Sequence, residues 1–297
     1  MSNAGGDSAP PRFSATSTRM PGPSRGSVAG ALLLACALWA SAADAATLRF
    51  LRDDKEVGTL DLPALERQCR VEVVTVDDPQ YESRHRFRAC PLREVLRLGL
   101  GTDVSALGGH DVIFRALDGY AKPAPGSLMA EDGGWVAFAD ADRPSGFAPL
   151  GRKGLDPGPF YLVWSKPTQR DTNVYPWPYQ LDAIEVTDLA RRYPHTVPRD
   201  VSHDAAAWAG FDLFRHECIS CHAINGEGGK VGPDLNIPQS IVEYRPIEQV
   251  KAYIRNPAVF RYGNMPSHEY LSAQDLDALI AYFQVMKTQK HDPAKIR

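Results

Sequence analysis

Five consecutive residues, Cys218-Ile219-Ser220-Cys221-His222, carry the most specific chemistry in the chain. Cysteines three positions apart lie on one turn of a helix, so both thiols can reach the same side of a planar group. The imidazole that follows can bind a metal. This CxxCH pattern is typical of covalent haem attachment, in which each thiol adds to a vinyl group and the histidine binds iron. Zinc binding and dithiol chemistry also use paired cysteines, and the five residues alone leave those alternatives open.

Further residues on both sides of this motif match a known family in their order along the chain. They are Gly210 and Phe214 in a predicted helix, then Gly232-Pro233-Asp234-Leu235, then Asn264-Met265-Pro266, and finally Leu279, Tyr282 and Phe283 in a last predicted helix. On these residues, the region from Asp200 to the end resembles class I c-type cytochromes. In that family the first and last helices cross, with glycine and aromatic residues packed at the contact.

The resemblance implies one covalently bound haem c, with His222 as the proximal iron ligand and Met265 as the distal ligand. It also implies that the Pro233 carbonyl accepts a hydrogen bond from the His222 ring, which would orient the imidazole and raise its basicity. A thioether ligand favours ferrous iron and raises the reduction potential, and two axial ligands leave the iron no open position. We therefore expect electron transfer rather than oxygen binding. His268, three residues after Met265, remains an alternative distal ligand.

The hydrophobic patterns predict that two domains position these residues. Residues 46–192 are expected to form an α+β module, residues 193–202 a linker with two prolines and little periodicity, and residues 203–297 an all-α cytochrome c domain. Strands are predicted at Val71–Val76, His85–Ala89, Val112–Ala116, Trp135–Ala139, Phe160–Trp164 and Ala183–Val186. Helices are predicted at Pro63–Gln68, Leu92–Gly99, Asp204–His216, Pro246–Asn256 and Ser272–Thr288, the last with a capping box of Ser272 and Asp275.

Cys69 and Cys90 lie on either side of two predicted strands that are joined by a turn. If these strands form an antiparallel hairpin centred near Pro79-Gln80, the two cysteines face each other at its open end. This pairing predicts a disulfide, which suits an exported protein. Two buried thiols and a metal site are the alternatives.

The order of elements in the first module resembles the molybdopterin-binding domain of sulfite-oxidase-like enzymes. The similar stretches are Cys90–Leu96, Arg115–Tyr120, Gly158–Val163 and Trp177–Val186. Enzymes of that family place a molybdenum-binding cysteine after the strand that matches Val71–Val76. Here that place reads Asp77-Asp78-Pro79. With no thiolate there, we expect the fold without molybdopterin or molybdenum catalysis.

The start of the chain has the features of a leader. Residues 1–45 contain three arginines, then an apolar run, Val28–Trp39, that is too short to span a bilayer, then small residues that fit a signal-peptidase site. Cys36 lies in the apolar run and is expected to be lost with the signal peptide; lipid attachment at Cys36 and a buried N-terminal helix are alternatives. We expect a periplasmic mature protein with no transmembrane helix.

The charge balance narrows the class of partner. The 297 residues include 33 Lys and Arg against 36 Asp and Glu, a formal net charge of −3. No cationic surplus is available for nucleic acid or an anionic membrane, which argues against both as main partners. The resemblance to c-type cytochromes implies periplasmic redox donor and acceptor proteins as partners. The sequence therefore predicts an electron-transfer cytochrome with an N-terminal docking or sensing module, more a carrier than an autonomous enzyme. The alternatives are an oxidoreductase whose first domain oxidises a small substrate and reduces the haem, and a redox-responsive binding protein.

Overall fold

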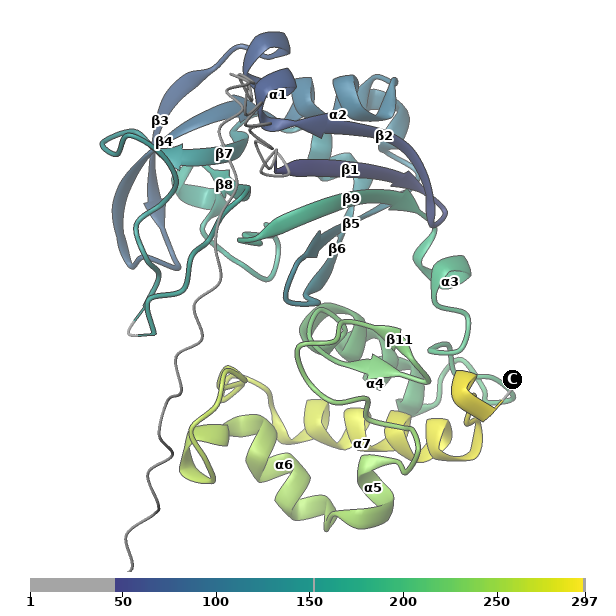
Figure 1. Ribbon diagram of the computed structural model, residues 1–297. Coiled ribbons are helices and arrows are strands. Elements are labelled where there is room, and N and C mark those ends of the chain that lie inside the picture. Colours follow the sequence, from purple (N-terminus) through teal and green to yellow (C-terminus); the bar gives the residue numbers. More distant parts are fainter. Residues whose placement is uncertain (1–45, 152, 296–297) are drawn as a thin grey trace, which may run out of the picture. The chain divides into compact units, whose positions relative to one another are not determined.

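The computed structural model describes residues 46–151 and 153–295 (Figure 1). The predicted leader, including Cys36, lies outside these residues. The described chain has two parts, a strand-rich N-terminal region up to Thr187 and a helical C-terminal region after it. No helix in these residues is long and apolar enough to cross a membrane.

Two β-sheets make up the strand-rich region. The first sheet has the strand order β2-β1-β9-β5-β6, in which only β1 and β9 pair in parallel. Its strands are β1 (Thr47–Arg52), β2 (Lys55–Asp61), β5 (Asp111–Ala116), β6 (Ala121–Pro125) and β9 (Leu181–Thr187). The second sheet has the order β3-β4-β7-β8 and is antiparallel throughout. Its strands are β3 (Glu72–Asp78), β4 (Ser83–Pro91), β7 (Gly134–Asp140) and β8 (Tyr161–Trp164).

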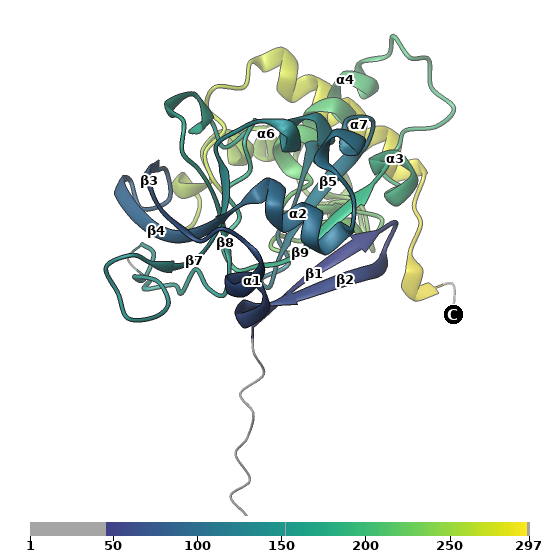
Figure 2. The same ribbon diagram turned by 90° about the horizontal axis from the view of Figure 1, so that it is seen from above.

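One hydrophobic core joins both sheets to the helix α2 (Leu92–Leu100), which contacts strands of each sheet (Figure 2). The apolar face of α2 is buried, and the helix ends where Gly101 adopts a left-handed conformation with φ of 64°. The shorter helix α1 (Leu62–Gln68) begins where the Asp61 side chain accepts a hydrogen bond of 2.6 Å from the Ala64 amide. Both helices were predicted from the sequence, and the structure confirms them.

All six predicted strands are present, with ends that differ by at most two residues. The sequence did not predict β1, β2 and β6 in this region, nor the two-residue strands at Ala223–Ile224 and Glu227–Gly228. Strand β2 is an edge strand with mostly exposed side chains, so it lacks the alternating apolar pattern of a half-buried strand. Strand β6 reads AKPAP, and its prolines argue against a strand except at an edge, where β6 lies.

The hairpin of β3 and β4 differs from the predicted register by two residues. Glu72 pairs with Ala89 and Asp78 with Ser83, so a four-residue loop replaces the tight turn at Pro79-Gln80. The side chain of Asp78 causes this wider loop, because Oδ1 accepts hydrogen bonds from the amides of Gln80 and Tyr81 at 2.7 and 3.0 Å. Cys69 and Cys90 are therefore not cross-strand neighbours in this ladder.

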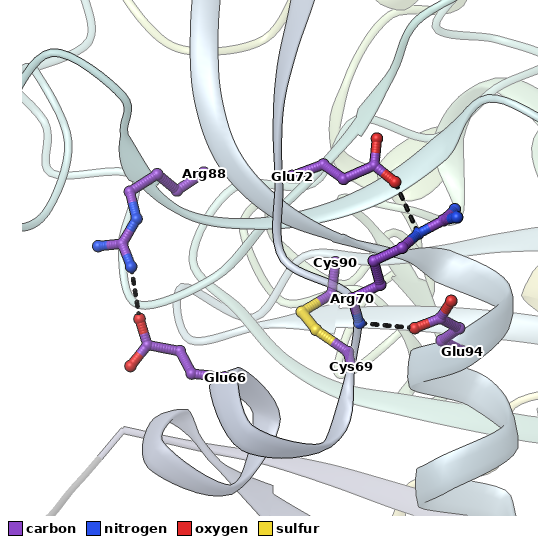
Figure 3. Close-up of a disulfide and its surroundings, with 7 residues drawn as sticks. All are labelled: Glu66, Cys69, Arg70, Glu72, Arg88, Cys90 and Glu94. Carbon is purple, nitrogen blue, oxygen red and sulfur yellow. Dashed lines mark hydrogen bonds and ion pairs between the residues drawn. A yellow bond between two sulfur atoms is a disulfide. The ribbon is translucent and has the colours of Figure 1, made fainter.

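The structure nevertheless contains a disulfide between Cys69 and Cys90, with Cα atoms 5.9 Å apart (Figure 3). Cys69 follows the last residue of α1, and Cys90 lies near the end of β4 with its side chain fully buried. Beside the bond, the Arg70 amide donates to Glu94 of α2 at 2.8 Å. The disulfide thus fixes the end of α1 to β4, at the point where β4 leads into α2.

The helical region also contains two β-residue pairs and several short helical turns. Its α-helices are α3 (Leu189–Arg192), α4 (Ala206–Leu213), α5 (Ile241–Tyr244), α6 (Ile247–Arg255) and α7 (Ala273–Thr288). Its short strands are β10 (Ala223–Ile224) and β11 (Glu227–Gly228). In the helical region, a π-helical turn covers Phe214–Cys218, and 3₁₀ turns cover Pro257–Val259 and Pro293–Lys295. The strand-rich region has 3₁₀ turns at Val104–Leu107, Gly126–Ala130 and Pro167–Gln169. The predicted capping box of Ser272 and Asp275 starts α7.

Residues 193–202, predicted as a linker, are packed against the helical region. Tyr193 is buried in the core of that region. The Thr196 carbonyl accepts a hydrogen bond of 2.7 Å from the hydroxyl of Tyr282 in α7, and the backbone of Arg199 bonds in both directions with the Gln289 side chain. The low hydrophobic periodicity of this segment reflects its irregular backbone, which bonds side chains of the helical region: Tyr282, Gln289, Glu227 and Asn225.

The helices α4 and α7 cross at Gly210. A Cβ atom at this position would lie 2.0 Å from the Ala278 carbonyl oxygen and 2.8 Å from the Cβ of Tyr282. One turn later, the Phe214 ring packs against those of Tyr282 and Phe283, with centroids 5.5 and 6.5 Å apart. Glycine is therefore required at the crossing, and the aromatic rings fill the space beside it.

We predict that Gly210→Ala destabilises the protein by at least about 2 kcal/mol, because the new methyl group overlaps backbone atoms that cannot move independently of α7. Gly109→Ala is the matched control, since a Cβ there meets nothing within 4 Å and the residue does not have a left-handed conformation. Chemical denaturation of both variants measures the difference. Equal stabilities would contradict the role assigned to Gly210.

Candidate haem site

The CISCH segment follows directly from α4 through the π-helical turn. The Ile219 amide bonds the Phe214 carbonyl at 2.8 Å, and the amides of Cys221 and His222 both bond the Cys218 carbonyl, at 3.1 and 2.9 Å. These bonds keep both cysteines and the histidine on one tight turn. Both thiols are free and partly exposed. The local geometry therefore presents two thiols and one imidazole together, as attachment to a single planar group requires.

The imidazole of His222 is held by its Nδ1 atom, which lies 2.8 Å from the Pro233 carbonyl oxygen. Because a carbonyl only accepts, Nδ1 is the protonated nitrogen and Nε2 carries the free lone pair. Burial lowers the pKa of His222 and the bond to Pro233 opposes this shift. A neutral, oriented imidazole with Nε2 available is the form that binds a metal.

The ring of His222 also packs tightly on Gly232, which precedes Pro233. A Cβ at Gly232 would lie 2.4 Å from the ring carbon Cε1 and 2.7 Å from Nδ1. The Gly232 amide is in turn bonded to the Cys221 carbonyl at 2.8 Å. The Gly-Pro pair therefore positions the imidazole in two ways, through a hydrogen bond and through close contact with a bare backbone.

Electrostatics argue against dithiol catalysis at the two cysteines. Burial, followed by the nearby Glu217, raises the pKa of Cys218 to about 12, and burial also raises the pKa of Cys221. Reactive dithiols depend on the opposite shift, which increases the thiolate fraction. In the described residues, no group of three or more His, Cys, Asp and Glu side chains comes together to hold a metal ion, as a zinc site would need. The thiols, the imidazole and their spacing fit haem c instead.

The two candidate distal ligands lie in the loop before α7. Met265 is partly buried and packs against the core of the helical region. His268 is buried, its amide bonds to the carbonyls of Ile254 and Arg255, and its ring atom Nδ1 has no hydrogen-bond partner among the described residues. The structure thus keeps a soft thioether and an unpaired imidazole nitrogen in the same loop.

In the strand-rich region, the place where the sequence resemblance puts a metal-binding cysteine is occupied by Asp78, the last residue of β3. This side chain is fully buried, and burial raises its pKa. Its Oδ1 accepts a third hydrogen bond, of 3.1 Å, from the hydroxyl of Tyr161. Asp78 is therefore engaged in holding the hairpin loop and the core, and the two cysteines of this region are bonded to each other.

Comparison with known proteins agrees with this geometry for the C-terminal part of the chain. Residues 207–287 match the family model for cytochrome c. These residues form a cytochrome c domain. A stretch of 81 residues is 35% identical to cytochrome c oxidase subunit 2 of Alkalihalophilus pseudofirmus, covering 25% of this chain and 24% of that protein. The chain thus spans about a quarter of that relative's length, and the match adds no information about the strand-rich region.

Sequence reasoning missed one set of residues next to the cytochrome c domain, the turn and strand at 118–122. The Ala121 amide donates to the Ser220 carbonyl inside the CISCH segment at 2.9 Å, and the Gly119 carbonyl accepts from the Lys230 amide at 2.8 Å. From the sequence, Asp118 and Tyr120 are interpreted only as part of a turn that follows the strand Val112–Ala116. The available signal was Lys122, a charged residue between apolar neighbours in the strand Ala121–Pro125.

We predict that Gly232→Ala lowers the free energy of unfolding by about 1 to 3 kcal/mol, because the added methyl group overlaps the His222 ring and forces it away from the Pro233 carbonyl. Gly263→Ala is the control within the same domain, since a Cβ there meets nothing within 4 Å. Thermal unfolding followed by circular dichroism compares the two variants. A Gly232→Ala protein as stable as the Gly263→Ala protein would refute the close contact.

Proposed function

We propose that this chain is a periplasmic electron-transfer protein that carries one haem c, bound through Cys218 and Cys221, with His222 as its proximal iron ligand. The observation that carries the proposal is the Nδ1–Pro233 hydrogen bond of His222, which leaves Nε2 free beside two thiols on the same turn. The cytochrome c match over residues 207–287 supports it independently. When bound, haem supplies a centre that gains and loses one electron.

The protein's own residues define what that centre can do. The thioether bonds would tether the haem to the turn after α4, and the Pro233 carbonyl orients the proximal imidazole. The Gly210 crossing fixes α4 against α7 and so places the turn. Met265 would supply the second protein ligand to the iron, and a thioether ligand would favour electron transfer and a raised reduction potential.

The strand-rich region serves as a docking or sensing module in this proposal, without molybdopterin. Its two cysteines are joined to each other, and the acidic residues at the end of β3 offer no thiolate for molybdenum. A disulfide of this kind suits an oxidising compartment, which agrees with the predicted signal peptide and with periplasmic redox donors and acceptors as partners. The alternative function is an oxidoreductase in which this region oxidises a small substrate and reduces the haem.

Haem attachment is tested by producing the full chain, with its leader, in a periplasm that contains the haem-attachment machinery. We expect one covalent haem per chain, one iron and no molybdenum, measured by pyridine haemochrome spectra and elemental analysis. The double variant Cys218→Ser and Cys221→Ser is expected to carry no covalent haem. Loss of covalent haem only from Cys69→Ser would refute the assignment, and stoichiometric molybdenum in the wild-type protein would favour the oxidoreductase.

The distal ligand is tested by two single substitutions in the same loop. Met265→Ala is expected to remove the near-infrared absorption band of sulfur-ligated ferric haem and to lower the reduction potential, because the soft thioether no longer stabilises ferrous iron. His268→Ala is expected to keep that band. The reverse result, with the spectrum changed only by His268→Ala, would assign His268 as the distal ligand.

A further inference from the structure

A short segment of the strand-rich region lies directly on the haem-attachment segment. The Ala121 amide donates to the carbonyl of Ser220, which lies between Cys218 and Cys221 and directly precedes Cys221. The Gly119 carbonyl bonds the Lys230 amide, and Gly119 has a φ of 92°, which strongly favours glycine. The ammonium group of Lys122 donates to the His216 carbonyl at 3.0 Å, two residues before Cys218. Residues 119–122 therefore bond the attachment segment itself at Ser220 and the chain on either side of it at His216 and Lys230.

Lys122 is unusual among these contacts because it brings a charge. Only 6% of the residue is exposed, although lysine is almost never buried without an ionic partner. Among the described residues, no carboxylate is close enough to form an ion pair with its ammonium group. The acidic groups that act on it from a longer distance are Glu217 and Asp171, and its cysteine neighbours are Cys218 and Cys221. Both cysteines become uncharged thioethers once haem is attached.

Neither acidic group neutralises Lys122 locally. The Glu217 carboxylate accepts a hydrogen bond of 2.5 Å from the Tyr270 hydroxyl; this neutral donor leaves its charge in place, but Glu217 acts on Lys122 only from a distance and not as an ion pair. Asp171 is exposed and its charge is screened by solvent. Burial lowers the pKa of Lys122, and the carboxylates and the hydrogen bond to the carbonyl favour the charged form. The structure thus holds a weakly compensated cation beside the attachment site.

We propose that the buried ammonium group of Lys122, which lies outside the cytochrome c domain, raises the reduction potential of the haem through its positive charge. This inference rests on the proposed haem attachment at Cys218 and Cys221. Oxidation of the haem adds one positive charge, and a nearby buried cation disfavours that charge more strongly than a cation in water would. The reduced haem gains no such charge. Removing the cation therefore favours the oxidised form and lowers the potential.

The proposal gives the strand-rich region a direct role in electron transfer without any cofactor of its own. Because β6 pairs with β5 through the register Phe114 to Lys122, the position of the ammonium group depends on the first sheet.

The test is a potentiometric titration of the full-length protein with its haem, recorded for wild type and four variants. Lys122→Met removes the charge with little change in side-chain length, and Lys122→Gln removes the charge but keeps a donor. Lys122→Arg keeps the charge. Lys55→Met removes an exposed charge from β2 as the matched control. Visible spectra of every sample establish covalent haem before the potential is compared.

We expect Lys122→Met and Lys122→Gln to have a lower reduction potential than wild type, with Lys122→Arg and Lys55→Met close to wild type. Three results would overturn the proposal: unchanged potentials in both neutral variants, an equal decrease in Lys122→Arg, or loss of haem attachment in both neutral variants. The last result would assign Lys122 to assembly of the attachment segment. Failure of the wild-type chain itself to carry haem would refute the proposed function instead, so the two failures are distinguishable.

Discussion

The close crossing of α4 and α7 at Gly210 is the constraint on which the haem site depends. The π-helical turn begins at Phe214, directly after the last residue of α4. The direction of α4 at this crossing therefore determines where Cys218 and Cys221 lie. The α4–α7 crossing, where glycine leaves α4 without a side chain, thus positions the attachment turn. The same helix α7 also holds residues 193–202, the segment by which the chain enters the domain, because the Tyr282 hydroxyl donates a hydrogen bond to the Thr196 carbonyl.

The sequence predicts the helices and strands well where burial imposes a period. The apolar face of α2 and the capped start of α7 follow directly from residue spacing. The register of β3 and β4 could not be derived in this way, because the loop length depends on one side chain, Asp78, that folds back onto the backbone. The disulfide is present although this register was wrong, since its geometry depends on where α1 ends rather than on the ladder.

The candidate site divides along similar lines. The positions of His222 and the two thiols follow from a local motif, and the structure places the Pro233 carbonyl at the Nδ1 of His222, as the family resemblance implies. The distal ligand remains a proposal, because Met265 and His268 share one loop. Lys122 is 96 positions before Cys218, and no local pattern indicates that a strand of the first sheet reaches the attachment segment. Tertiary packing alone creates that contact.

Side chains of the strand-rich region and of the haem segment pack in one hydrophobic cluster, so the strand-rich region is part of the surroundings of the haem segment. Ile113 and Ala121 of the first sheet belong to the same hydrophobic cluster as Phe214 and Ile219 of the haem segment. Partial unfolding of that sheet would expose these side chains to water and remove the buried cation at the same time. The disulfide constrains the second sheet, which shares one hydrophobic core with the first, and so helps to preserve the electrostatic setting of the haem segment. The stability of the strand-rich region can therefore influence electron transfer at the haem segment.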